Sequence, residues 1–266
     1  MADAPLLELQ NVKKRFAAIE VLRGVSMTVR AGQVTALVGD NGAGKSTLIK
    51  GLAGIHQYDD GAIIWEGRKV EIPNPRAASA IGIEFVYQDL ALCDNLDVVQ
   101  NMFLGRERHR SAFFGRRNDH GLFLDDGSME EAARETLARL SVTTLRSVRQ
   151  KVSGLSGGQR QSVAVAKAVM WNSKLVVLDE PTAALGVAQT KQVLTLVRTL
   201  ADRGLGVILI SHNLEDVLKV ADSIAVLRLG VMVAQPDRKD VTSRELVELI
   251  TTGRSSDRSP AAQAEA

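Results

Sequence analysis

The stretch that decides the fold is Gly39-Asp40-Asn41-Gly42-Ala43-Gly44-Lys45-Ser46. Before it, Val34-Thr35-Ala36-Leu37-Val38 is typical of a strand buried on both faces, and residues 46–52 after it are typical of a helix. A glycine-rich turn in this context indicates a phosphate-binding loop, because its backbone can curl until several N–H groups point inward. The helix N-terminus adds positive potential, which favours a polyphosphate site over a tight turn with a surface lysine.

The loop contributes most of the candidate nucleotide ligands. Lys45 is expected to reach the β- and γ-phosphates, and the hydroxyl of Ser46 is expected to ligate Mg²⁺. The loop residues predicted to bind nucleotide are Gly39, Asn41, Gly42, Gly44, Lys45, Ser46 and Thr47.

A second element delivers two carboxylates. The run Leu175-Val176-Val177-Leu178 predicts a buried strand, and Asp179-Glu180 follows it at the sheet edge where ligands bind in such folds. Asp179 suits Mg²⁺, directly or through water, and Glu180 can polarise an attacking water as a general base. Taken alone, the pair could also be a solvated strand end. Together with the phosphate loop, it indicates a P-loop nucleotidase.

A third element narrows the class further. Leu155-Ser156-Gly157-Gly158-Gln159 opens a predicted helix over 159–171, with Ser156 as its cap. The two glycines allow an anion to approach exposed N–H groups, so Ser156, Gly157, Gly158 and Gln159 form a second candidate phosphate-binding device. An ordinary capped helix is the alternative interpretation of this segment alone.

Composition excludes several classes. The net charge is +2 and aromatic residues make up 4% of the 266 residues, which argues against a nucleic-acid partner. Cys93 is the one cysteine, so an internal disulfide is excluded and a reducing compartment is expected. No apolar run approaches the roughly 18–20 residues that span a bilayer, and the first residues do not resemble a secretory signal. We therefore expect a cytosolic protein, attached to a membrane only through a partner.

LSGGQ at 155–159, between a phosphate loop and VVLDE at 176–180, resembles the nucleotide-binding subunit of ATP-binding cassette (ABC) transporters over about residues 5–252. The resemblance implies an α/β fold: a P-loop NTPase (RecA-like) core with an antiparallel β subdomain and an inserted α-helical subdomain near residues 90–170. Residues 106–126 would form an irregular, arginine-rich insertion, and residues 253–266 a disordered tail. It also implies a head-to-tail homodimer in which each ATP lies between the phosphate loop of one copy and the Ser156 segment of the other.

Three further roles follow from the resemblance. Gln88 matches the glutamine that touches Mg²⁺ and the attacking water, and His212 matches the switch histidine that contacts the γ-phosphate. Phe16 occupies the position where the family stacks an aromatic ring on adenine, although a core phenylalanine beside Val12 is an equal alternative. His56, His109 and His120 lack such a context and are interpreted as ordinary.

One departure from the family pattern concerns the dimer-contact loop. The family usually has Ser-Ala-Leu-Asp after Pro181-Thr182, whereas this chain has Ala183-Ala184-Leu185-Gly186. This variant and the segment 101–107 resemble the ATPases of ribose-, xylose- and fructose-type importers. We therefore expect an ATPase that drives uptake of a monosaccharide, through permease subunits at the cytoplasmic face of the inner membrane, with a periplasmic binding protein as an indirect partner. Residues 89–96 and 98–103, expected to be exposed, are the predicted dock for the permease.

The alternative is a cytosolic cassette ATPase without a transport role, of the DNA-repair or translation type. Repair-type proteins need a long coiled coil between the phosphate loop and LSGGQ, but only about 110 residues separate Lys45 from Leu155 and no heptad run fills them. Translation-type proteins carry two cassettes in one chain.

Overall fold

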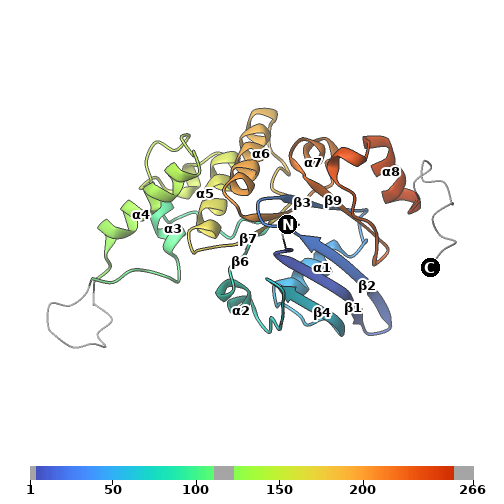
Figure 1. The fold of residues 1–266 in the computed structure, drawn as a ribbon. Coiled ribbons are helices and arrows are strands. Elements are labelled where there is room, and N and C mark those ends of the chain that lie inside the picture. Colours follow the sequence, from blue (N-terminus) through green and yellow to red (C-terminus); the bar gives the residue numbers. More distant parts are fainter. Residues whose placement is uncertain (1–3, 111–122, 255–266) are drawn as a thin grey trace.

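The computed structural model describes residues 4–110 and 123–254, and two sheets organise that part of the chain. The first sheet is antiparallel with strand order β2-β1-β4-β5. It is formed by β1 (Leu7–Phe16), β2 (Ile19–Val29), β4 (Asp60–Trp65) and β5 (Arg68–Val70). In Figure 1 its strands β1, β2 and β4 lie side by side on the flank of the molecule opposite α6 and α7.

The β1–β2 hairpin is longer than the two short strands at 6–9 and 25–29 that alternation alone predicts. The strands pair from Leu7↔Val29 to Phe16↔Ile19, with register shifts along the ladder. Asn11 has a φ of 50°, and such a bulge interrupts the in–out alternation that marks a strand in sequence.

The second sheet has strand order β10-β9-β3-β8-β7-β6, and its inner strands run parallel. Its members are β3 (Val34–Val38), β6 (Ile83–Val86), β7 (Leu175–Asp179), β8 (Gly206–Ile210), β9 (Ser223–Arg228) and β10 (Val231–Ala234). β3, β7 and β8 are buried along nearly their whole length, as continuous apolar runs predict. The predicted hairpin around Leu229-Gly230 is confirmed by the antiparallel β9–β10 pair.

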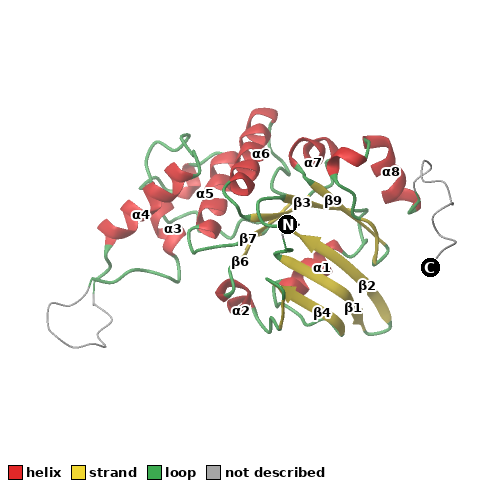
Figure 2. Cartoon of the chain, viewed as in Figure 1, coloured by secondary structure: helices red, strands yellow, loops and turns green. Residues whose placement is uncertain are grey.

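Most helices gather at two opposite ends of the described structure, as Figure 1 and Figure 2 show. α3 (Val98–Phe103), α4 (Asp126–Arg139) and α5 (Gly157–Val169) gather at one end, whereas α7 (Leu214–Val220) and α8 (Ser243–Thr252) lie at the other. α6 (Val187–Asp202) lies between these groups. α1 (Lys45–Leu52) and α2 (Pro75–Ala80) are the remaining α-helices of the described residues, with 3-10 turns at Val152–Gly154 and Arg238–Asp240.

Three apolar clusters hold these layers together. Leu48, Ile49 and Leu52 of α1 share one cluster with apolar side chains of the antiparallel sheet and of β7 and β8. α1 is therefore packed between the two sheets, and this fixes the phosphate loop that precedes it. The other clusters join α3–α6 to the parallel sheet and α7–α8 to β3 and β9.

The structure contradicts one expectation about the middle of the chain. The expectation that the apolar residues of 98–103 are exposed is wrong, because Val98, Val99, Met102 and Phe103 are buried in the core beneath α4 and α5.

Most of the arginine-rich insertion, residues 111–122, and residues 255–266 of the tail lie outside the described residues. Within the described ranges, no helix combines the length and apolarity required to cross a membrane.

Candidate nucleotide-binding site

Four strand ends meet at one edge of the parallel sheet. Because β6, β7, β8 and β3 run in the same direction, the residues that follow them share that edge. A cleft of about 490 Å³ opens there. Its lining includes the predicted residues Gly39, Asn41, Gln88, Glu180 and His212, together with Asp40. Thus segments separated by more than 100 positions in the sequence converge on one cavity.

The phosphate loop depends on its glycines. Gly39 has a φ of 155°, and a Cβ there would collide with the backbone oxygen of Leu227 on β9. Gly44 has a φ of 107° and is the N-cap of α1, without a side chain that caps the helix. No acidic residue lies in the first turn of α1, so the positive end of the helix dipole is available to an anion.

Lys45 folds back over the loop that precedes it. Its Nζ donates hydrogen bonds to the carbonyl oxygens of Gly39, at 2.7 Å, and Asp40, at 3.1 Å. The ammonium group is therefore held at the mouth of the loop, where a polyphosphate would replace these carbonyl groups as its partner.

The two carboxylates after β7 have different surroundings. Burial raises the pKa of Asp179, the neighbouring charge of Glu180 raises it further, and Lys45 and Lys50 oppose both effects. Glu180 has a left-handed backbone, with a φ of 50°, and its N–H donates to the carbonyl of Ile210 on β8. Its Oε2 lies 2.6 Å from Nδ1 of His212, which follows β8. The Glu180 carboxylate is thus turned toward the neighbouring strand end and held there.

The oxygen donors near the loop suit Mg²⁺. The candidate ligands are the Ser46 hydroxyl, the Gln88 side-chain amide and the Asp179 carboxylate, all hard oxygen donors of the kind that Mg²⁺ prefers. Among the described residues no cluster of three or more His, Cys, Asp or Glu side chains could hold a metal by itself.

The Ser156 segment is built as the sequence predicts but lies elsewhere. Ser156 is the N-cap of α5: its Oγ accepts from the N–H of Gln159, and Oε1 of Gln159 accepts from the N–H of Ser156 at 2.9 Å. A Cβ on Gly157 would press on Leu185 and one on Gly158 on Gln189, so these glycines let α5 approach the start of α6. Ser156 is exposed and does not line the cleft.

Phe16 lies at the tip of the β1–β2 hairpin. Its side chain is 46% exposed, so the alternative that it is a core residue beside the buried Val12 is wrong. The ring stands edge-on to His56, with centroids 5.5 Å apart, and Lys14 Nζ lies 5.4 Å from its centroid. His56, interpreted as ordinary from the sequence, therefore packs against this exposed ring.

The sequence interpretation missed one wall of the cleft. Leu214 from α7 and Val247, Ile250 and Thr251 from α8 complete its lining. The apolar residues of α8 recur at helical spacing, which predicts an amphipathic helix. No spacing in the sequence indicates that this helix returns to the phosphate loop some 200 residues away.

Comparisons with known proteins agree with this geometry. Residues 22–183 match the profile of the family described as ABC transporter. The chain is 42% identical, over 93% of its length and 94% of the relative's, to a xylose/arabinose import ATP-binding protein of Sulfolobus acidocaldarius. It is 41% identical, over 94% and 95% of the two chains, to a fructose import ATP-binding protein of Rhizobium meliloti. An ATP-binding cassette of an ABC transporter, solved in its ADP conformation, superposes with a TM-score of 0.74 at 26% identity, covering 94% of this chain and 96% of that one.

Proposed function

The chain belongs to the ABC transporter family, and from this premise we propose that it is the ATP-hydrolysing subunit of a monosaccharide importer. The convergence of the phosphate loop, Gln88, Glu180 and His212 on one cleft carries the proposal. The import names of its relatives, for xylose/arabinose and for fructose, support a pentose or hexose as the cargo. The alternative of a repair- or translation-type ATPase gains no support from these relatives.

We assign the steps of the proposed hydrolysis to named side chains. The phosphate loop and Lys45 hold the triphosphate, and the N-terminus of α1 stabilises its charge. Glu180, held toward His212, accepts a proton from the attacking water, and Gln88, which lines the same cleft, orients that water. Mg²⁺ held by Ser46, Asp179 and Gln88 would neutralise charge on the β- and γ-phosphates.

A complete site requires a second copy of the chain. At the N-terminus of α5, Ser156 and Gly157 are exposed, Gly158 is buried and Gln159 is half-buried, and none of the four lines the cleft of its own copy. We propose that the γ-phosphate joins Lys45 of one copy to Ser156 of the other in a head-to-tail dimer. Hydrolysis removes this link, so nucleotide shifts an equilibrium between a closed and an open dimer.

Transport places this cycle at a membrane. The proposed partners are permease subunits, which would hold the ATPase at the cytoplasmic face of the inner membrane, and a periplasmic sugar-binding protein that acts on the permease. Phe16, exposed at the hairpin tip, is the proposed stacking partner of adenine. Residues 5–252 are the proposed ATPase unit, with the helices near 90–170 as its subdomain.

The test combines hydrolysis with uptake. Purified protein should hydrolyse ATP in the presence of Mg²⁺, and Lys45→Ala should abolish both nucleotide affinity and hydrolysis. Deleting the gene should abolish uptake of at least one of a panel of labelled monosaccharides, and the Lys45→Ala gene should not restore it. Uptake of every sugar at the wild-type rate in the deletion strain would contradict the transport proposal.

A further inference from the structure

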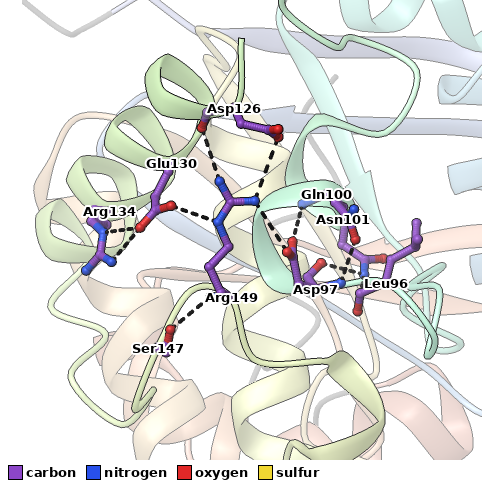
Figure 3. Close-up of polar contacts among 9 residues, drawn as sticks. All are labelled: Leu96, Asp97, Gln100, Asn101, Asp126, Glu130, Arg134, Ser147 and Arg149. Carbon is purple, nitrogen blue, oxygen red and sulfur yellow. Dashed lines mark hydrogen bonds and ion pairs between the residues drawn. The ribbon is translucent and has the colours of Figure 1, made fainter. Parts of the chain in front are cut away.

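The turn that follows Gln88 is held by one buried side chain. This turn, residues 93–97, is named here the post-glutamine turn. The amide oxygen of Asn101 accepts from the N–H of Cys93 at 2.7 Å. The amide nitrogen of Asn101 donates to the carbonyls of Cys93 and Asp97, both at 3.0 Å, and of Leu96 at 3.4 Å. Asn101 is fully buried, and Figure 3 shows it beside Leu96 and Asp97.

The post-glutamine turn is also joined to the segment that leads into Ser156. Val152 donates its N–H to Leu96 and Ser153 donates its N–H to Asp94, both at 3.0 Å. Immediately after the turn, the N–H groups of α3 donate in the opposite direction, Val98 to Gln150 and Val99 to Val148, both at 3.2 Å. Four backbone hydrogen bonds therefore connect the neighbourhood of the turn to residues 148–153, only three residues before Ser156.

One arginine connects the same two segments through side-chain contacts. Arg160 lies one helical turn after Ser156, and its Nη1 is 2.9 Å from Oδ1 of Asp94. The same guanidinium donates to the carbonyls of Ser153 and Leu155, both at 3.3 Å. Arg160 thus binds the carbonyl groups just before the Ser156 cap and, through Asp94, connects them to the post-glutamine turn.

A second arginine braces the other side of the turn. Arg149 lies 3.5 Å from Asp97, the N-cap of α3, and 2.7 Å from Glu130 on α4 (Figure 3). It also donates to the carbonyl of Asp126 at the start of α4. The turn is therefore held against α4 as well as against the segment before Ser156, so it has little freedom to move alone.

We propose that Asp94 is a positioning residue for Ser156 and that it acts through Arg160. A displacement of the post-glutamine turn would then shift the Ser156 cap, because the two are joined by the Arg160 contacts and the backbone ladder. The inference rests on the proposed function, in which Ser156 meets the γ-phosphate on a second copy. It adds a named connection between the segment after Gln88 and the far phosphate-binding device.

The test uses Asp94→Ala, Asp94→Glu and Arg160→Ala in the full chain, with Glu135→Ala on the exposed face of α4 as the matched control. Exposed ion pairs are weak, so Asp94→Ala should lower kcat about two- to fivefold while the ATP affinity of a single copy stays unchanged. Asp94→Glu should recover most of kcat, and Glu135→Ala should match the wild type. In the Arg160→Ala background, Asp94→Ala should lower kcat little further, because each substitution removes the same contact between Asp94 and Arg160.

Amide hydrogen exchange separates this inference from the proposed function. In Asp94→Ala without nucleotide, the N–H groups of Val152 and Ser153 should exchange about two- to fivefold faster, whereas α8 should be unaffected. Wild-type exchange at these amides, or fully additive effects of Asp94→Ala and Arg160→Ala on kcat, would overturn the inference. A Glu180→Gln protein that stays monomeric with ATP would instead overturn the proposed function, and the exchange result would still decide the role of Asp94.

Discussion

Oε2 of Glu180 lies 2.6 Å from Nδ1 of His212, and the two residues end neighbouring strands of the parallel sheet. The glutamate side chain is 18% exposed, whereas the histidine side chain is 71% exposed. The less exposed glutamate is thus oriented by a partner that remains accessible from the cleft. Under the proposed function, in which Glu180 is the general base, the orientation of that base depends on both strand ends.

Glu180→Gln is expected to retain ATP and to lose turnover by about 10²–10³. The amide preserves the size of the side chain but cannot accept a proton from water. Because ATP then persists, the variant should accumulate a dimer that wild-type protein forms only transiently. Steady-state hydrolysis and sedimentation with Mg-ATP measure the two effects, and a near-normal rate would exclude Glu180 as the base.

His212→Ala tests the pair rather than the single residue. Removing the imidazole leaves the Glu180 carboxylate without its 2.6 Å partner, so kcat should fall although the base itself remains. In the Glu180→Gln background the same change should add little, because residues that act as a unit have non-additive effects. Multiplicative losses in a double-mutant cycle would show that the two side chains act independently.

Gly39→Ala is expected to damage both stability and nucleotide binding. The new Cβ would meet the backbone oxygen of Leu227, and a φ of 155° is strained for alanine. We expect a loss of about 1–3 kcal/mol in the free energy of unfolding, with ATP affinity at least tenfold weaker. The control is Gly127→Ala in the first turn of α4, where the nearest atom is 3.9 Å away and where alanine should stabilise by about 0.5 kcal/mol. Urea denaturation measures the unfolding free energy of the two variants, and nucleotide titration measures their ATP affinity.

The parallel half of the fold is accessible to sequence reasoning because its strands are buried on both faces. Residues 34–38 and 206–210 are strands with the predicted bounds, and 187–202 is a helix with the predicted bounds. Residues 10–16 and 19–24 escape strand prediction, because most of their side chains are exposed or half-buried and bulges break their alternation. That hairpin is held by contacts with distant residues, such as Lys13 with Asp60 at 2.8 Å.

The residues of the site differ in the same way: some are predictable from local sequence, and others depend on distant contacts. Motif residues are predictable because a strand, a tight turn and a helix N-terminus impose their chemistry locally, as at Gly39 and Ser156. The α8 wall, with Val247 and Ile250, is not predictable, because an amphipathic pattern does not show which surface the helix covers. The burial of α3 escapes prediction for a related reason: its apolar face packs on α4 and α5, which follow later in the chain.

Gly186→Asp restores the usual residue of the dimer-contact loop and should stabilise the protein. Gly186 is the N-cap of α6, with extended backbone angles and open space where a Cβ would lie. A carboxylate there can accept from a free N–H of the first turn and interact with the helix dipole, together worth about 0.5 kcal/mol. Gly186→Asn is the matched control, since it supplies the hydrogen bond without the charge. Urea midpoints give the order, and an aspartate variant less stable than wild type would contradict the proposed cap.

Acidification is expected to destabilise the protein through His56. Burial lowers the pKa of His56 from its ordinary value of 6.5, and the positive charge of Lys14 acts in the same direction, against the opposing effects of the Gln57 and Thr47 backbones and of Asp59. Below about pH 6.5 the unfolded chain therefore binds a proton that the folded chain does not. The free energy of unfolding should fall as the pH drops from 6.5 toward the lowered folded-state pKa, and the loss should level off below it.

His56→Phe isolates this effect, because it keeps an aromatic ring beside Phe16 and Tyr58 but cannot titrate. The difference in unfolding free energy between wild type and variant should be constant above about pH 7.5 and should shift in favour of the variant below about pH 6.5. Urea denaturation at a series of pH values measures the difference directly. A difference that is flat down to about pH 5, or one that shifts toward the wild type, would show that His56 titrates normally or gains a proton on folding.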